Sequence, residues 1–113
     1  MLVTKENINE FIEGSSMDCP DMDITHIEYI PDGITGLYCW NNKLTELPKL
    51  PESLTDLYCS DNKLTELPIL PNSLKRLDCR NNNLPYDITI KNFKEHNTLL
   101  KRKLILEKIR LYD

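Results

Sequence analysis

Apolar residues recur at a fixed spacing along the middle of the chain. When the chain is aligned on a twenty-residue period, an aliphatic residue, a leucine, a cysteine, an asparagine and a leucine occupy the same positions in three successive segments. The segments are residues 34–53, 54–73 and 74–87. In the second segment the five positions are Leu54, Leu57, Cys59, Asn62 and Leu64. Residues 14–33 form a degenerate copy in which Met22 replaces the asparagine. Such a period predicts a repeat protein whose units bury their apolar faces against one another.

Each segment contains an alternation that predicts one short strand. Leu57 and Cys59 are two residues apart and point to one side of an extended chain, whereas Tyr58 points to the other. Successive strands are expected to stack in parallel about 4.8 Å apart. Further along, Pro68 and Pro71 are three residues apart, which matches polyproline II. We therefore expect the return path to be extended and not helical.

An asparagine follows each strand at the point where the chain is expected to bend inward. These residues are Asn42, Asn62 and Asn82. A short amide at a bend can donate to and accept from backbone groups that the bend leaves unpaired. We predict that each asparagine bonds to its own and the next repeat. A ligand-binding role for them is the alternative that we disfavour.

At this level of detail the chain resembles a known family. The phrases LPESLTDLYCSDNKLTELP and LPNSLKRLDCRNNNLP are similar to the short LPX-type leucine-rich repeats of bacterial secreted effectors and of giant DNA viruses and some protists. The cysteine in the strand favours the viral class. The resemblance covers residues 14–86 and implies an α/β solenoid, a right-handed coil with parallel concave strands, an extended convex side and helical caps at both ends. It also implies protein binding, with no indication of which partner.

Both flanks carry apolar residues suited to covering the ends of such a stack. For residues 1–13 we predict a capping helix of one to three turns over 5–13, with Thr4 as its N-cap and Ile8, Phe11 and Ile12 on one face. For residues 88–113 we predict a longer helix over 92–112. It bears two apolar stripes, Phe93, Leu100, Leu104 and Leu111 on one side and Ile105, Ile109 and Tyr112 on another.

The second stripe leaves two interpretations of the C-terminal helix open. In the first, which we favour, the helix is a cap and its second stripe is partly exposed or packs under the convex side. In the second, residues 92–112 pair with another copy of the chain as a homodimer, because large exposed apolar patches are unusual on monomers.

Charge is distributed unevenly between body and tail. Residues 1–87 contain 7 basic and 15 acidic residues, whereas residues 88–113 contain 7 basic and 3 acidic residues. An acidic body disfavours nucleic-acid binding, so a basic-tail anchor to a polyanion or an anionic membrane is a minor alternative. No stretch of about 20 apolar residues that could span a membrane is present. We expect a cytoplasmic protein, or one in the host cytoplasm if it is viral or a secreted effector.

The four cysteines share one phase of the repeat and raise the question of metal or redox chemistry. They are Cys19, Cys39, Cys59 and Cys79. No CxxC pair is present, and both histidines lie far from the cysteine phase, so we predict buried, reduced thiols that fill the core and no metal or cofactor. The sequence also lacks a Ser/His/Asp set and a glycine-rich phosphate loop. We therefore expect no enzymatic activity.

The outward positions of the strands are the remaining candidate for function. They form an aromatic centre edged by charged residues. Tyrosine, tryptophan and arginine are the residue types most enriched at binding hot spots. The predicted partner-binding residues are Tyr38, Trp40, Asp56, Tyr58, Ser60, Arg76, Asp78 and Arg80. A flanking column holds Asp21, Asn41, Asp61 and Asn81. The alternative is that the aromatics provide only cross-strand packing and that the charges form only surface ion pairs.

Overall fold

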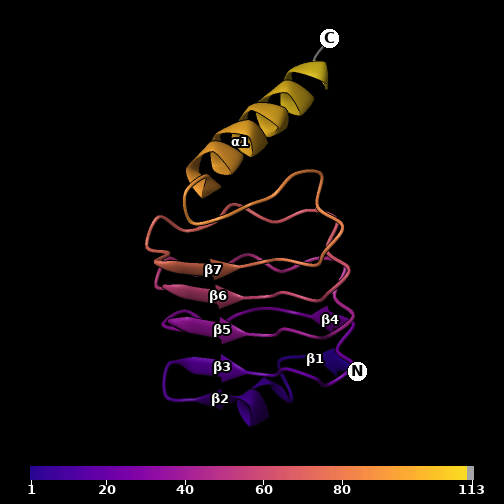
Figure 1. Cartoon of the computed structure of the whole chain (residues 1–113), viewed down its shortest axis with the longest axis vertical. Coiled ribbons are helices and arrows are strands. Elements are labelled where there is room, and N and C mark those ends of the chain that lie inside the picture. The colour runs from indigo at the N-terminus through magenta and orange to yellow at the C-terminus, as the bar shows by residue number, and fades with distance from the viewer. Residues whose placement is uncertain (112–113) are drawn as a thin grey trace.

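The protein has an α/β fold with a sheet of short, mostly parallel strands and one C-terminal helix (Figure 1). A computed structural model describes residues 1–111, which extend over 46 × 30 × 26 Å. The strands stack along the long axis in chain order, and the helix lies at the end of the stack (Figure 1).

Four strands of the sheet repeat at the predicted interval. They are β3 (Ser16–Asp18), β5 (Gly36–Tyr38), β6 (Asp56–Tyr58) and β7 (Arg76–Asp78). Each strand pairs in parallel with the next, and residues twenty positions apart stand opposite one another. Leu37, for example, lies opposite Leu57. Parallel stacking at this period is thereby confirmed.

Between these strands the chain returns without forming a helix, as expected from the prolines. Neighbouring segments stay hydrogen-bonded after the strand ends: the N–H of Lys63 donates to the carbonyl of Leu44 at 2.8 Å, and that of Asn83 to Leu64 at 2.9 Å. Each repeat therefore contacts its neighbour on both sides of the core.

The core consists of columns of repeat residues. Leu37 and Leu57 are fully buried, as are Leu44 and Leu64 one bend later. The corresponding residues of the last repeat, Leu77 and Leu84, are only half-buried. The apolar cross-section at the C-terminal end of the stack is therefore incompletely covered.

The N-terminal segment differs from the predicted helix. Its only helical part is η1 (Ile8–Phe11), a single 3-10 turn that begins after Asn7 and not after Thr4. On either side the chain forms strands: β1 (Leu2–Val3) pairs in parallel with β4 (His26–Ile27), and β2 (Ile12–Glu13) pairs antiparallel with β3. The helix prediction over 5–13 was wrong because sheet pairing recruits the residues on both sides of this turn. Ile8 and Phe11 are buried as predicted, and Ile12 is partly buried.

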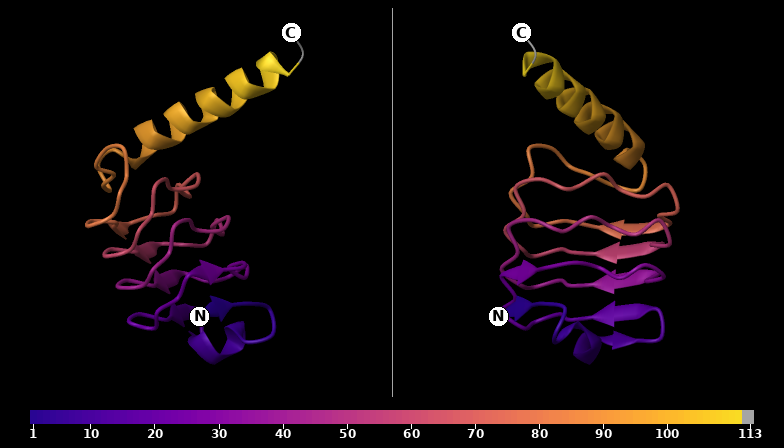
Figure 2. Two further views of the ribbon diagram at one scale, coloured as in Figure 1. Left: turned by 90° about the vertical axis from the view of Figure 1, so that its right-hand side faces the viewer. Right: turned by 180° about the vertical axis from the view of Figure 1, so that it is seen from behind.

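The C-terminal helix α1 (Phe93–Arg110) matches the predicted boundaries closely. Tyr112, which was assigned to its second stripe, lies outside the described residues. Only the first turns of α1 reach the body, where Phe93, His96 and Asn97 are buried. The rest of the helix rises away from the last repeat (Figure 2). The prediction that the whole stripe from Phe93 to Leu111 covers the stack was wrong, because Leu104 and Leu111 are exposed.

Polar bonds to the preceding repeat hold the base of α1. Asn97 exchanges two hydrogen bonds with the backbone of Leu70, accepting from its N–H at 2.8 Å and donating to its carbonyl at 2.7 Å. His96 contacts the Pro68 carbonyl through Nε2 at 3.2 Å and the Tyr86 hydroxyl through Nδ1 at 3.0 Å. Because a carbonyl can only accept, Nε2 donates to Pro68, while Nδ1 and the Tyr86 hydroxyl share the second hydrogen bond. These contacts fix the direction in which α1 leaves the body.

Candidate functional site

The outward side of the parallel strands forms a shallow, open hollow of about 550 Å³. Seven of the eight predicted binding residues line it: Tyr38, Trp40, Asp56, Tyr58, Ser60, Arg76 and Asp78. The eighth, Arg80, is exposed beside it and is bound to Asp78. The repeat therefore brings the predicted residues together from β5, β6, β7 and the residues that follow them.

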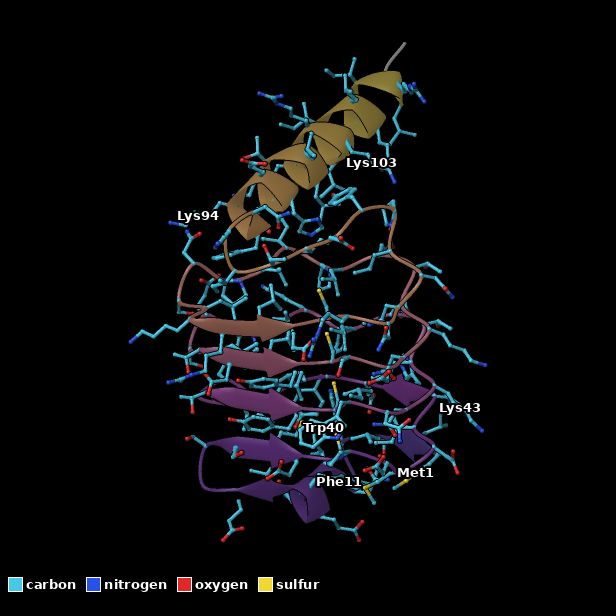
Figure 3. All side chains as sticks on the ribbon, viewed as in Figure 1. Met1, Phe11, Trp40, Lys43, Lys94 and Lys103 are labelled. Carbon is cyan, nitrogen blue, oxygen red and sulfur yellow. The ribbon has the colours of Figure 1, made fainter. Side chains whose placement is uncertain are left out.

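Three aromatic side chains form the centre of the hollow. The rings of Tyr38 and Tyr58 are stacked, with centroids 5.4 Å apart and planes inclined by 15°. The rings of Trp40 and Tyr38 form a T-shaped pair, with centroids 6.2 Å apart and planes inclined by 85°. Trp40 lies just beyond the end of β5 (Figure 3). Both arrangements are favourable for aromatic pairs.

Gly36 makes room for this arrangement, and the sequence analysis did not single it out. A Cβ atom at Gly36 would lie 2.7 Å from Cε2 and 2.9 Å from the hydroxyl of Tyr38. The Tyr38 ring therefore lies directly over the glycine. The sequence did contain a signal for this role. Gly36 stands at an outward strand position, and the corresponding positions of the next two repeats carry the large polar residues Asp56 and Arg76.

A chain of polar contacts surrounds the aromatic centre. The Tyr38 hydroxyl donates to Asp56 Oδ2 at 3.2 Å, and the other carboxylate oxygen of Asp56 accepts from Arg76 at 3.3 Å. Partial burial and the Asp56 carboxylate raise the pKa of Tyr38. Asp78 forms a bidentate pair with Arg80 at 3.0 Å for both contacts, and hydrogen bonding from Arg80 lowers the pKa of Asp78. The charges at the rim of the hollow are thus held in fixed positions.

The asparagine column supports the site from behind. Asn62 Nδ2 donates to the carbonyls of Cys39 and Cys59, and its Oδ1 accepts from the N–H of Leu44 at 3.0 Å. Asn42 and Asn82 make the corresponding bonds. Each asparagine therefore joins its own repeat to the preceding one. The prediction that it bonds to the next repeat was wrong in direction, because the bend turns the amide back toward the N-terminal neighbour.

The flanking column has a structural role that the sequence analysis missed. Its members, Asp21, Asn41, Asp61 and Asn81, all have left-handed backbone conformations, with φ of 56°, 54°, 55° and 58°. Aspartate and asparagine tolerate this conformation better than other non-glycine residues. Their side chains also bond in pairs: Asn41 donates to Asp21, and Asn81 to Asp61. The sequence indicated this role, because only aspartate and asparagine occur at this position of the four repeats.

The cysteine column lies inside the core, behind the aromatic face. Cys39 and Cys59 are fully buried, and all four cysteines are free thiols. Burial raises the pKa of Cys19 to about 12 and that of Cys79 to about 11, and it raises the pKa values of Cys39 and Cys59 as well. At neutral pH these thiols are protonated and poor nucleophiles.

Comparison with known proteins adds no assignment: the chain matches no family model and no curated protein. Within residues 1–111 there is no cluster of three His, Cys, Asp or Glu side chains placed to hold a metal ion. Over the same residues, no helix has the length and apolar character needed to cross a membrane.

Proposed function

We propose that the chain is a leucine-rich-repeat solenoid that acts as a protein-binding module, with the hollow on its parallel strands as the binding face. The main observation behind this proposal is that seven of the predicted residues line one hollow, whose centre is aromatic. The parallel strands in twenty-residue register and the buried leucine and cysteine columns support the family resemblance.

The chemistry of the face favours a protein or peptide ligand. Tyrosine and tryptophan offer large, rigid contact areas, and Arg76 and Asp78 offer charged hydrogen-bonding groups at the rim. Trp40 is 36% exposed although it is a large apolar side chain, so burial by a partner would be favourable. We propose binding without catalysis, because the face combines no nucleophile with an activating base.

Cross-strand packing, the competing interpretation, accounts for the Tyr38–Tyr58 stack but not for every member of the face. Trp40 meets Tyr38 at a nearly right angle and is not part of the stack. Ser60 and Trp40 stand at corresponding positions of neighbouring repeats, and both line the hollow. A face serving only for packing would not require an open hollow at this position.

The test is selection of peptide ligands from a random library on the intact wild-type protein, followed by affinity measurements with a Trp40→Ala/Tyr58→Ala variant. Leu106→Ala is the matched control, because Leu106 is an exposed apolar residue on α1, away from the strands. Trp40 is the only tryptophan, so its fluorescence reports directly on occupancy of the face in the wild type.

We expect the selected peptides to change the Trp40 fluorescence, to bind the Leu106→Ala variant normally and to lose at least about tenfold in affinity, or about 1.4 kcal/mol, on the double variant. Equal affinity for the wild type and the double variant would refute the proposed site. Circular dichroism of the double variant separates loss of binding from loss of fold.

A further inference from the structure

The outer part of α1 carries a large apolar surface with no cover in the described chain. Beyond Asn97, six aliphatic side chains are exposed: Leu99, Leu104, Ile105, Leu106, Ile109 and Leu111. A helix of about this length is only marginally stable in water unless its apolar face packs against something. Exposed apolar area of this kind marks an interaction surface.

The space beneath α1 is lined by apolar residues on both walls. Two hollows of about 250 and 280 Å³ lie between the helix and the repeats, and Leu100 lines both. Leu67 lies on the body wall of both, and Leu104 lies on the helix wall of the second. We call these two hollows together the wedge. It opens where Leu84 is left half-buried and where α1 lifts from the body (Figure 2).

The two walls of the wedge carry opposite charges. Glu66 lines both hollows from the body side, and Glu46 lines the second. From the helix side Lys103 lines the first hollow, opposite Glu66 of the same copy. It is one of six basic residues, against two acidic residues, in the helix from Phe93 to Arg110. Neither glutamate nor any basic residue of α1 takes part in an ion pair within residues 1–111. Among the described residues, one copy therefore presents basic side chains on the helix and acidic side chains on the body wall at the same end, none of them in an ion pair.

We propose that apolar side chains of α1 from a second copy fill the wedge, so that two chains form a symmetric dimer through antiparallel α1 helices. In this arrangement Leu104 and Leu111 of each helix pack against the underside of the other. The basic outer half of each helix then lies against Glu46 and Glu66 of the other copy. Lys103 is on this outer half, whereas Lys94 is at the helix base (Figure 3).

The surface at this end of the molecule is complementary to itself, which favours a second copy of the chain as the occupant of the wedge. A twofold interface requires that one surface carry both members of every contact, and this end carries the apolar stripe, the wedge, the acids and the bases. The helix is about 27 Å long at 1.5 Å per residue, so an antiparallel pair can place each tip beside the base of the other helix. The proposal is independent of the strand face and goes beyond the proposed function.

The first experiment measures the mass of the intact chain in solution by sedimentation equilibrium over a range of concentrations. The expected result is a reversible dimer of twice the 13.2 kDa monomer mass. Leu104→Glu should weaken the dimer at least tenfold, whereas Leu106→Glu should not. The two residues are both exposed and lie on opposite sides of the helix, so the substitutions are matched. A wild-type protein that stays monomeric, or a dimer broken by Leu106→Glu and not by Leu104→Glu, would overturn the proposal.

A charge-reversal pair tests the antiparallel arrangement itself. One variant carries Glu46→Lys/Glu66→Lys, and the other carries Lys103→Glu/Lys108→Glu. Each variant alone would place like charges of helix and body against each other in a dimer, so it should be monomeric. In a mixture of the two variants, the basic helix of one faces the acidic body of the other and the acidic helix faces the basic body, so a heterodimer should form. Failure of the mixture to associate when the wild type dimerises would refute the antiparallel arrangement. Persistence of the dimer in Trp40→Ala/Tyr58→Ala is also expected, because the strand face takes no part.

Discussion

Removal of the asparagines one at a time should destabilise the protein in a graded order that follows from the backbone groups each one satisfies. Asn42 Oδ1 accepts from the N–H groups of Met22 and Ile24 at 3.0 and 2.9 Å, and its Nδ2 donates to the Cys19 carbonyl at 2.8 Å. Within the described chain these three backbone groups have no other hydrogen-bond partner. Asn42→Ala leaves all three unsatisfied.

Asn62→Ala has a smaller effect for a structural reason. The Cys39 carbonyl keeps its bond from Asn42, and the Cys59 carbonyl keeps its bond from Asn82. Only the buried N–H of Leu44 is left without a partner. At about 1–3 kcal/mol for each unsatisfied buried group, Asn62→Ala should cost about 1–3 kcal/mol. Asn42→Ala should cost about 3–5 kcal/mol, because one of its three groups is only partly buried and water can reach it.

The last asparagine and a neighbouring control complete the series. Asn82 is half-buried at the end of the stack, so water can replace its bonds and Asn82→Ala should cost less than about 2 kcal/mol. Asn83 is exposed and bonds only through its backbone, so Asn83→Ala should stay within about 0.5 kcal/mol.

Urea unfolding followed by circular dichroism measures these differences as shifts of the midpoint at constant slope. A total stability of about 5–15 kcal/mol is usual for a domain, so the largest effect should be visible as a partly unfolded variant. An Asn62→Ala variant that is less stable than Asn42→Ala would refute the reasoning. So would a series in which all three resemble Asn83→Ala.

Further predictions concern the thiols, the aromatic face and the base of α1. Because burial raises the folded-state pKa of Cys59, the folded protein retains a proton that the unfolded chain loses above about pH 9. Stability should therefore fall as the pH rises above 9, and urea midpoints should fall less steeply in Cys59→Ala; an unchanged slope would contradict this. Gly36→Ala should displace the Tyr38 ring with a stability loss of about 1 kcal/mol or less, because the ring can swing outward. Near-UV circular dichroism should show the lost stack, and an unaltered spectrum would mean that the ring does not depend on the glycine. Asn97→Ala leaves the N–H and carbonyl of Leu70 unpaired and should cost about 2–4 kcal/mol. Hydrogen exchange should then accelerate throughout α1, and unchanged protection would show that Asn97 does not anchor the helix.

The repeat made the central part of the fold predictable. A leucine and a cysteine two residues apart determine which side of each strand faces inward, and the period determines which residues become neighbours. The positions of Tyr38, Tyr58 and Trp40 on one face followed directly. The left-handed conformation of the flanking aspartates and asparagines was also readable in principle, because their short side chains tolerate it.

The ends were less predictable because their structure depends on long-range partners. Nothing local to residues 1–13 shows that Val3 pairs with Ile27 or that Ile12 pairs with Met17. Helical periodicity likewise predicted the apolar stripe of α1 but not the direction in which the helix leaves the body. That direction depends on His96 and Asn97, two polar residues that bond to Pro68 and Leu70, 28 and 27 positions earlier in the chain. The role of Gly36 was hidden because it requires knowledge of the ring that lies over it.

The most direct measurement of the central claim is solution NMR of the intact protein titrated with a peptide selected on its wild-type surface. The proposed function predicts that the largest shifts cluster on β5, β6, β7 and the residues that follow them, including the indole of Trp40. Shifts confined to α1 or to the N-terminal residues, with the Trp40 indole unchanged, would contradict it.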